Sequence, residues 1–92
     1  MKVALTERFQ RDVKALDGDR RAAVFESILA LPLALGEPHR HPGLGLRKLH
    51  SSGIWEARVG LGLRLVFALE PAVLNLVRVG SHEDVRRYLR EL

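Results

Sequence analysis

The chain has 92 residues, of which 47% are hydrophobic, carries a net charge of +4, and contains no cysteine. This length fits one domain spanning residues 1–92, and the apolar content predicts an ordered core rather than a disordered chain. The lack of cysteine excludes a disulfide scaffold and any thiolate nucleophile or metal ligand.

A short strand and a helix are expected at the amino-terminal end. Residues 2–5 can form the strand, and Thr6 is a suitable N-cap for the helix. Phe9, Val13 and Leu16 recur at helical spacing, so they predict the face that packs on a core. The same end resembles no signal peptide, and no apolar run reaches transmembrane length. We therefore expect a cytoplasmic protein without a membrane partner.

A second helix follows the break at Asp17-Gly18-Asp19, with Asp19 as its expected cap. Its expected apolar stripe consists of Val24, Phe25, Ile28 and Leu29. Proline has no amide hydrogen and clashes with the preceding turn, so Pro32 predicts the end of this helix near Leu31. The two helices should form a hairpin whose apolar faces lie on a sheet.

The stretch from Ile54 to Leu69 predicts a β-hairpin around the turn Gly60-Leu61-Gly62. Because side chains alternate along a strand, one face should be apolar and the other should carry Arg58 and Arg64 side by side. Opposed like charges cost roughly 0.2–1 kcal/mol, so this pair favours an anion-binding role. The structural alternative is that both arginines extend into solvent or meet Glu56. Centring the turn on Leu61 pairs Val59 with Leu63, Arg58 with Arg64, Ala57 with Leu65 and Trp55 with Phe67.

Strands are expected on both sides of this hairpin, at residues 46–50 and 73–79. The register of the last strand stays open: one turn length puts Arg78 beside Arg64, and a slip of one residue sends it to the other face. The expected fold is α+β, with an N-terminal helical hairpin packed on a four-stranded antiparallel sheet, an optional extra N-terminal strand and a short C-terminal helix. Ser81 is the expected cap of that helix, and its buried side would consist of Val85, Tyr88, Leu89 and Leu92.

The positive charge is unevenly distributed. Up to Pro38, six basic residues are matched by six acidic ones, so all of the net charge lies beyond that point. The segment from His39 to Arg64 carries Glu56 as its only acidic residue, against Arg40, Arg47, Lys48, Arg58 and Arg64. Such segregation suits nucleic acid or an acidic protein partner. A generic basic surface is the alternative.

Histidine spacing does not predict a metal site. His39 and His41, with His50 and His82, have no companions at metal-ligand spacing. The two Gly-x-Gly pairs, Gly43 to Gly45 and Gly60 to Gly62, do not match a nucleotide-binding fingerprint between a strand and a helix, so we expect turns. Neither a metal nor an organic cofactor is therefore expected.

Metal-independent RNA cleavage is the chemistry that fits the basic residues. The 2′-OH must lose a proton, charge on phosphorus must be offset, and the departing 5′-oxygen must gain a proton. Arginine stays charged and grips phosphate oxygens in a bidentate manner, so Arg58 and Arg64 fit the second need. Proton transfer would fall to His82, His50, Glu56, Tyr88 or Lys48. The structural alternatives are an exposed strand end for His50, a first helical turn for His82, core packing for Tyr88 and an ion pair with Arg58 or Lys48 for Glu56.

Four segments in order carry a family resemblance: Pro42-Gly-Leu-Gly-Leu-Arg-Lys-Leu49, Gly53-Ile-Trp-Glu-Ala-Arg-Val-Gly60, Leu63-Arg-Leu-Val-Phe67 and Val77-Arg-Val-Gly-Ser-His-Glu-Asp-Val85. Together they resemble the RelE/ParE toxin superfamily of bacterial type II toxin–antitoxin systems. The resemblance covers nearly the whole chain and implies a toxin held inactive by an acidic, partly disordered antitoxin segment over the basic residues. It implies cleavage of translated mRNA at the ribosome or, in the ParE branch, inhibition of DNA gyrase. A degenerate member that only binds an antitoxin or nucleic acid is the third alternative.

Carried over residue by residue, the resemblance also implies roles. Arg64 matches the arginine that contacts the scissile phosphate, Arg58 matches that of Arg-Val-Gly, and His82 falls within one residue of the terminal His/Arg. The chain departs from many members at Leu63 and Arg86, where they have tyrosine, so the acid/base pair stays open. We expect Arg64, Arg58 and His82 to be catalytic, Glu56 and Tyr88 to be further acid/base candidates, and RNA to be bound by Arg47, Lys48, His50, Arg78 and Arg86.

Overall fold

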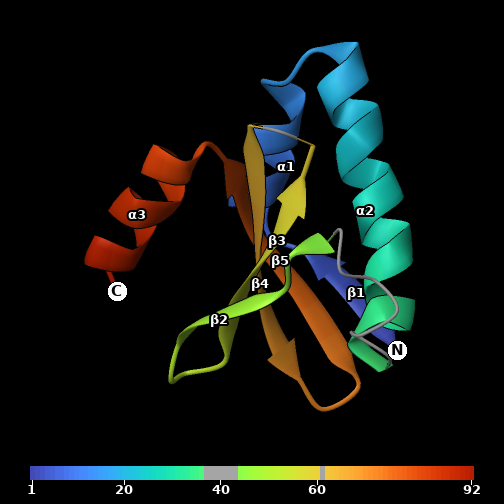
Figure 1. Cartoon of the computed structure of the whole chain (residues 1–92), viewed down its shortest axis with the longest axis vertical. Coiled ribbons are helices and arrows are strands. Elements are labelled where there is room, and N and C mark those ends of the chain that lie inside the picture. Colours follow the sequence, from blue (N-terminus) through green and yellow to red (C-terminus); the bar gives the residue numbers. More distant parts are fainter. Residues whose placement is uncertain (37–43, 61) are drawn as a thin grey trace.

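Within the part of the chain that the structure describes, five strands form one mixed sheet with three helices packed around it (Figure 1). The computed structural model describes residues 1–36, 44–60 and 62–92. The expected α+β class is confirmed and the extra N-terminal strand is present, whereas His39, Arg40, His41, Gly43 and Leu61 lie outside the described residues. The elements are β1 (Lys2–Leu5), α1 (Glu7–Lys14), α2 (Gly18–Gly36), β2 (Arg47–His50), β3 (Ile54–Val59), β4 (Leu63–Glu70), β5 (Val73–Gly80) and α3 (His82–Arg90).

The sheet has the strand order β1-β5-β4-β3-β2. Strand β1 runs parallel to β5, and the other neighbouring pairs are antiparallel. The hairpin register is the one that the sequence predicts: Trp55 lies opposite Phe67, Ala57 opposite Leu65, Arg58 opposite Arg64 and Val59 opposite Leu63. Period-two alternation and the short turn are enough to set this register, because a slip by one residue would turn Arg58 or Arg64 toward the main core.

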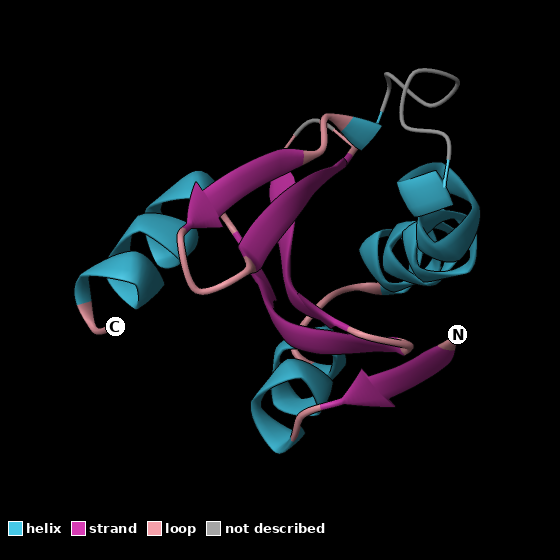
Figure 2. Cartoon of the chain, turned by 90° about the horizontal axis from the view of Figure 1, so that it is seen from below, coloured by secondary structure: helices cyan, strands magenta, loops and turns pink. Residues whose placement is uncertain are grey.

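Both faces of the sheet are covered. The larger cluster joins α1 and α2 to one face, and the smaller cluster joins α3 to the other face through Val85, Tyr88 and Leu89. Figure 2 shows α2 and α3 on opposite sides of the sheet. None of the described helices is long and apolar enough to cross a membrane. The buried side chains of the larger cluster are Phe9, Val13, Val24, Leu31, Ala57, Val59, Leu63, Leu65, Phe67, Leu74, Leu76 and Val79.

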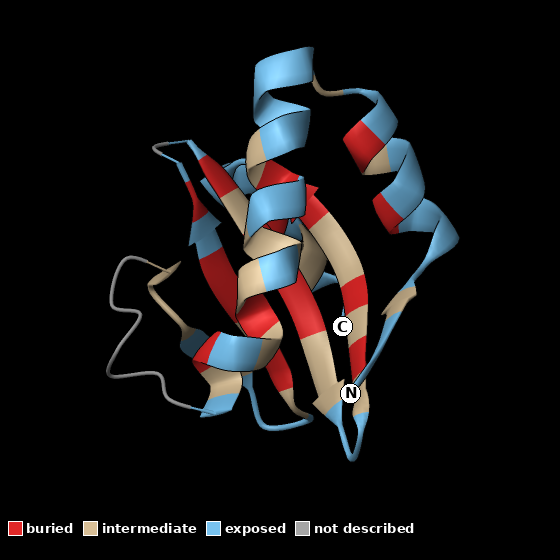
Figure 3. Ribbon diagram, turned by 90° about the vertical axis from the view of Figure 1, so that its right-hand side faces the viewer, coloured by how far each residue is buried: buried red, intermediate tan, exposed pale blue. Residues whose placement is uncertain are grey.

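The expected buried stripe of α2 is partly wrong. Val24 is buried and Ile28 is partly buried, but Phe25 is 47% exposed and Leu29 is 77% exposed (Figure 3). The helix instead buries Val24, Leu31 and Ala34, and its exposed side carries Phe25, Leu29 and Leu33 at successive four-residue steps. Two apolar ridges therefore run along α2, and only one of them packs against the sheet.

The expected ends of the second and third helices also need correction. The carboxylate of Asp17, rather than Asp19, caps α2 by accepting a hydrogen bond from the Arg20 amide at 2.9 Å. Pro32 lies inside α2, which continues to Gly36. A proline costs one hydrogen bond within the helix, but burial of Leu31 and Ala34 stabilises the turns around it. Helix α3 ends at Arg90, so Leu92 is exposed rather than buried.

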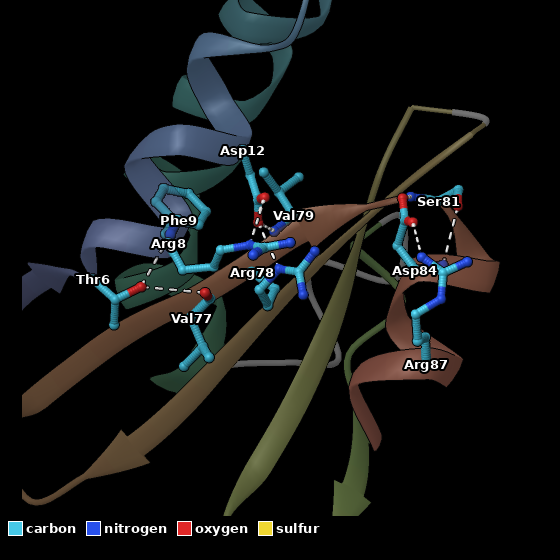
Figure 4. Close-up of polar contacts among 10 residues, drawn as sticks. All are labelled: Thr6, Arg8, Phe9, Asp12, Val77, Arg78, Val79, Ser81, Asp84 and Arg87. Carbon is cyan, nitrogen blue, oxygen red and sulfur yellow. Dashed lines mark hydrogen bonds and ion pairs between the residues drawn. The ribbon is translucent and has the colours of Figure 1, made fainter. Parts of the chain in front are cut away.

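Polar side chains of the α1 region attach to β5 beyond the residues that β1 pairs with (Figure 4). Strand β1 pairs with residues 73–76, and just past them the Thr6 hydroxyl donates to the Val77 carbonyl at 3.2 Å. The carboxylate of Asp12 then accepts hydrogen bonds from Arg78 Nε at 2.8 Å and from the Val79 amide at 3.1 Å. Helix α1 thereby satisfies backbone groups that an edge strand would otherwise expose.

Candidate functional site

Arg58 and Arg64 lie directly opposite each other on β3 and β4. Their strand neighbours Ala57, Val59, Leu63 and Leu65 belong to the larger core cluster, so both arginines are on the other face of the sheet. Arg58 is exposed and Arg64 is half-buried, with Nη1 donating to the Leu63 carbonyl at 3.3 Å. No carboxylate among the described residues forms an ion pair with either guanidinium. In this part of the chain the two like charges thus face each other across the strands without a carboxylate partner, an arrangement that suits an anion.

The row that contains these arginines continues onto β5 at Gly80, which lies opposite Arg64. His82 follows two residues later in the first turn of α3 and is exposed. The start of this helix is held by a capping box, in which the Asp84 amide donates to the Ser81 hydroxyl and the Ser81 amide donates to the Asp84 carboxylate. A Cβ on Gly80 would lie 2.6 Å from that carboxylate, so the site needs glycine there. Sequence reasoning placed the cap at Ser81 but missed the requirement at Gly80.

Hydrogen bonding at the cap also affects the acidity of Asp84. The backbone amide of Ser81, followed by its hydroxyl, holds the pKa of Asp84 below its ordinary value of 3.8. The guanidinium groups of Arg87 and Arg78 act in the same direction. Asp84 is therefore a carboxylate that fixes the N-terminus of α3, and with it the position of His82.

Glu56 is a buried carboxylate near this row, with 7% of its surface exposed. It lies two residues from Arg58 on β3, so both side chains are on the same face of the sheet. Its ion-pair partner is Arg47, at 3.7 Å between Oε1 and Nε, rather than Arg58 or Lys48 as expected. Arg47 lies opposite Glu56 in the antiparallel register, which explains the choice of partner.

The side chains of Arg47 and Lys48 are on opposite faces of the sheet. Lys48 lies opposite Trp55, whose ring packs against the larger core cluster, whereas Arg47 lies opposite Glu56. Both side chains are exposed at this edge strand, but alternation directs them to different faces. Of the two residues, only Arg47 is on the face that carries Arg58 and Arg64.

The other expected RNA contacts are dispersed. Arg78 is tied to Asp12 on α1, and Arg86 pairs with Glu83 at 3.5 Å on the same helix. The open register of β5 is resolved by a bulge: Val66 lies opposite Arg78, Phe67 lies opposite Leu76, and the row of Arg64 ends on Gly80. Arg78 is therefore not directly beside Arg64.

The remaining acid/base candidates have local structural roles. His50 is the exposed last residue of β2, where Nδ1 accepts a hydrogen bond from the Ser52 amide at 3.1 Å. Tyr88 is half-buried and packs in the smaller cluster beneath α3. Neither residue is brought to the Arg58–Arg64 row by the contacts described here, whereas His82 follows that row directly in the chain.

A polar cleft adjoins the same row where β5 ends. Its lining includes Leu63, Gly80, Ser81, Asp12 and Arg78, but Arg58, Arg64 and His82 do not line it. No group of three or more potential metal ligands occurs among residues 1–36, 44–60 and 62–92. The described side chains offer charge stabilisation by Arg58 and Arg64, with the buried carboxylate of Glu56 on the same face and His82 two residues beyond Gly80 in the chain.

No protein-family model and no curated relative matches the chain. Its structure is similar to that of a copper-bound mutant toxin from Helicobacter pylori, with 25% identity over 92% of this chain and 98% of that one, and a TM-score of 0.70. The RelBE2 toxin–antitoxin complex from Mycobacterium tuberculosis matches with 26% identity over 88% of this chain and 96% of the other, at a TM-score of 0.60. YafQ from Escherichia coli matches with 20% identity over 91% and 96%, at a TM-score of 0.73. The chain therefore has the RelE-like toxin fold, as its resemblance to that superfamily implies.

Proposed function

We propose that this chain is the toxin of a type II toxin–antitoxin system and acts as a metal-independent endoribonuclease on translated mRNA at the ribosome. The observation that carries the proposal is the directly opposed Arg58–Arg64 pair, on the sheet face away from the main core and without an ion-pair partner among the described residues. A sheet gains nothing from this arrangement, whereas a phosphodiester would bind both guanidinium groups. The structural similarity to RelBE2, a toxin–antitoxin complex, supports the toxin role.

The reaction that fits these residues is attack of the 2′-oxygen of RNA on the adjacent phosphorus. The new bond joins the 2′-oxygen to phosphorus, and the bond from phosphorus to the 5′-oxygen breaks. Arg58 and Arg64 would stabilise the charge that builds on the non-bridging oxygens during this step. Arginine is a poor proton donor and acceptor, so the two proton transfers need other side chains.

His82 is the acid or base that we assign to one of those transfers. It is exposed, it follows the Arg58–Arg64–Gly80 row by two residues, and the capping box fixes the helix turn that carries it. Glu56 is the second candidate, because it shares the face of Arg58 and is buried. Arg47 would position the RNA from the edge strand on that face, with His50 and Arg86 as more distant contacts. We assign Arg78 to structure because its guanidinium is paired with Asp12.

An acidic antitoxin segment is the partner that we propose for the same face. Carboxylates on such a segment would meet Arg58 and Arg64, and would exclude RNA from them by direct competition. An antitoxin that leaves Arg64 exposed to solvent in the complex would contradict this placement.

Cleavage of a translated mRNA in a purified translation system tests the proposed activity. Wild type should cut the message, whereas Arg64→Ala should lower the cleavage rate about 100- to 1000-fold, the usual effect of removing one group that stabilises transition-state charge. His82→Ala should also be impaired, and Arg11→Ala, which removes an exposed arginine from α1, serves as the matched control. Equal cleavage by all four proteins would refute the mechanism.

A gyrase inhibitor of the ParE type is the second candidate function. The observation that favours it is the exposed apolar ridge of α2, formed by Phe25, Leu29 and Leu33, which lies on the helical hairpin. A ridge of this kind suits contact with another protein surface. Gyrase-dependent DNA cleavage with mRNA left intact would support this function and exclude the nuclease.

A further inference from the structure

Gly45 lies just before β2, across from Arg58. The antiparallel register pairs Arg47 with Glu56, and continuing it by two residues brings Gly45 opposite Arg58. Gly45 has a φ of +55°, a conformation that residues with a side chain adopt at a cost. Arg58 is therefore flanked by another arginine on one side, Arg64, and by a residue without a side chain on the other.

The guanidinium of Arg58 occupies the space above Gly45. A Cβ on Gly45 would lie 3.0 Å from Cζ and 2.8 Å from Nη2 of Arg58, and closer still to Nε. Any other residue at position 45 would thus displace this guanidinium. Arg58 and Arg64 repel each other across the strands, and the space at Gly45 lies on the side of Arg58 that is away from Arg64.

We propose that Gly45 is a positioning residue for Arg58. Its bare backbone leaves room for the guanidinium against the start of β2, and its positive φ disfavours any residue with a side chain at that position. A flexible arginine side chain loses less freedom on binding when its position is already restricted, so this contact pre-organises the anion site. The functional part of this inference depends on the proposed nuclease role, whereas the contact between Gly45 and Arg58 does not.

Two glycines of the same chain allow a matched comparison. Gly60 has a φ of +62°, close to that of Gly45, but a Cβ there would meet nothing within 4 Å. Gly60→Ala therefore introduces similar backbone strain without touching Arg58. Gly45→Asn is a second variant at the tested position, since asparagine tolerates a positive φ better than alanine and still adds the Cβ.

Nitrogen NMR of the arginine Nε–H group tests the contact directly. We expect Gly45→Ala and Gly45→Asn to shift the Arg58 Nε signal and to lower its heteronuclear NOE, with the Arg64 signal changed less. Gly60→Ala should leave the Arg58 NOE as in wild type. An Arg58 NOE that is the same in wild type and in folded Gly45→Asn would overturn the inference, whatever the protein does to RNA.

A double-mutant cycle on mRNA cleavage tests the functional consequence. Gly45→Ala should lower kcat by at least tenfold in the wild-type background, and should cause no further loss in the R58A background, because a residue that acts through Arg58 has no effect once Arg58 is gone. Independent losses that multiply in the double mutant would show a general structural role and refute the positioning role. Failure of wild type to cleave RNA would remove the proposed function alone, and the NMR comparison would still decide the role of Gly45.

Discussion

Asp12 and Arg78, 66 positions apart in the sequence, meet at 2.8 Å between Oδ2 and Nε. Their side chains are only 12% and 17% exposed, and the same carboxylate accepts the Val79 amide at 3.1 Å. A second cation, Arg8, lies 3.4 Å from the other carboxylate oxygen of Asp12. This carboxylate therefore links α1 to β5. It also pairs with Arg78, which the sequence analysis predicted to bind RNA.

Asp12→Ala should destabilise the fold by about 3 kcal/mol, because it leaves a largely buried guanidinium and a strand amide without their partner. Asp12→Asn should lose less, since an amide oxygen can still accept from Val79. Chemical denaturation of both variants measures the free energy of unfolding. Glu26→Ala, at an exposed position of α2, is the control and should stay within about 0.5 kcal/mol of wild type. An Asp12→Ala variant as stable as this control would show that the ion pair contributes nothing.

Asp84 should make the stability of the protein depend on acidic pH. Its pKa in the folded state is below the ordinary 3.8, so the folded state binds fewer protons than the unfolded state as the carboxylate titrates. The stabilisation is fully present above about pH 3.8 and is lost as the pH falls through the lowered pKa. Above that range Asp84→Ala should cost about 1 kcal/mol, the usual effect of losing a helix cap.

Denaturation of wild type and Asp84→Ala between pH 2 and pH 6 measures the difference in their free energies of unfolding. We expect this difference to shrink as the pH falls below the ordinary pKa of the carboxylate. Glu83→Ala, on the same turn of α3 and outside the capping box, is the matched control. If the difference in the free energy of unfolding between wild type and Asp84→Ala stayed the same down to the lowest pH, the Asp84 carboxylate at the helix cap would not be its source.

Arg47 and Lys48 should differ in their effect on RNA binding, although both are exposed neighbours on β2. Each phosphate contact with a single strand contributes about 0.7 to the slope of log K against log salt concentration. Arg47→Ala should therefore reduce the slope by about 0.7, and Lys48→Ala should leave it unchanged, because Lys48 is on the Trp55 face. Titration of an uncleavable 2′-O-methyl oligonucleotide at several salt concentrations measures both. Equal reductions would mean that RNA contacts the edge strand from both faces.

Leu29→Glu should separate the two candidate functions. Leu29 is 77% exposed on α2, so the substitution should change the free energy of unfolding by less than about 0.5 kcal/mol. A gyrase inhibitor that docks through the α2 ridge should lose gyrase-dependent DNA cleavage, because a charge would be buried in the interface. A nuclease that uses the opposite face of the sheet should cleave mRNA at the wild-type rate, and impaired cleavage by the folded variant would place α2 in the nuclease site. Arg64→Ala is the reciprocal control: it should lower mRNA cleavage by a nuclease and leave the gyrase-dependent DNA cleavage of a gyrase inhibitor unchanged.

Sequence reasoning predicted the hairpin in residue-level detail and the second helix poorly. One face of residues 54–69 is apolar throughout, whereas the other face carries Glu56, Arg58 and Arg64 near a glycine turn, so the register shown keeps these charges out of the main core. In α2, Val24 with Ile28 and Leu31 forms one apolar ridge, and Phe25 with Leu29 and Leu33 forms another. Periodicity cannot choose between them, because the choice depends on how the helix lies on the sheet. The continuation of α2 through Pro32 was missed for the same reason: its stabilisation comes from packing.

The sequence by itself determined the opposition of Arg58 and Arg64, since a short turn and a period of two residues are local properties of the chain. Only the tertiary structure decided what surrounds each basic side chain. Asp12 of α1 holds Arg78, Glu56 of β3 holds Arg47, and Gly45 makes room for Arg58. Each of these contacts joins segments that are separate in the sequence, and ion pairing depends on distance and burial in space rather than on spacing along the chain.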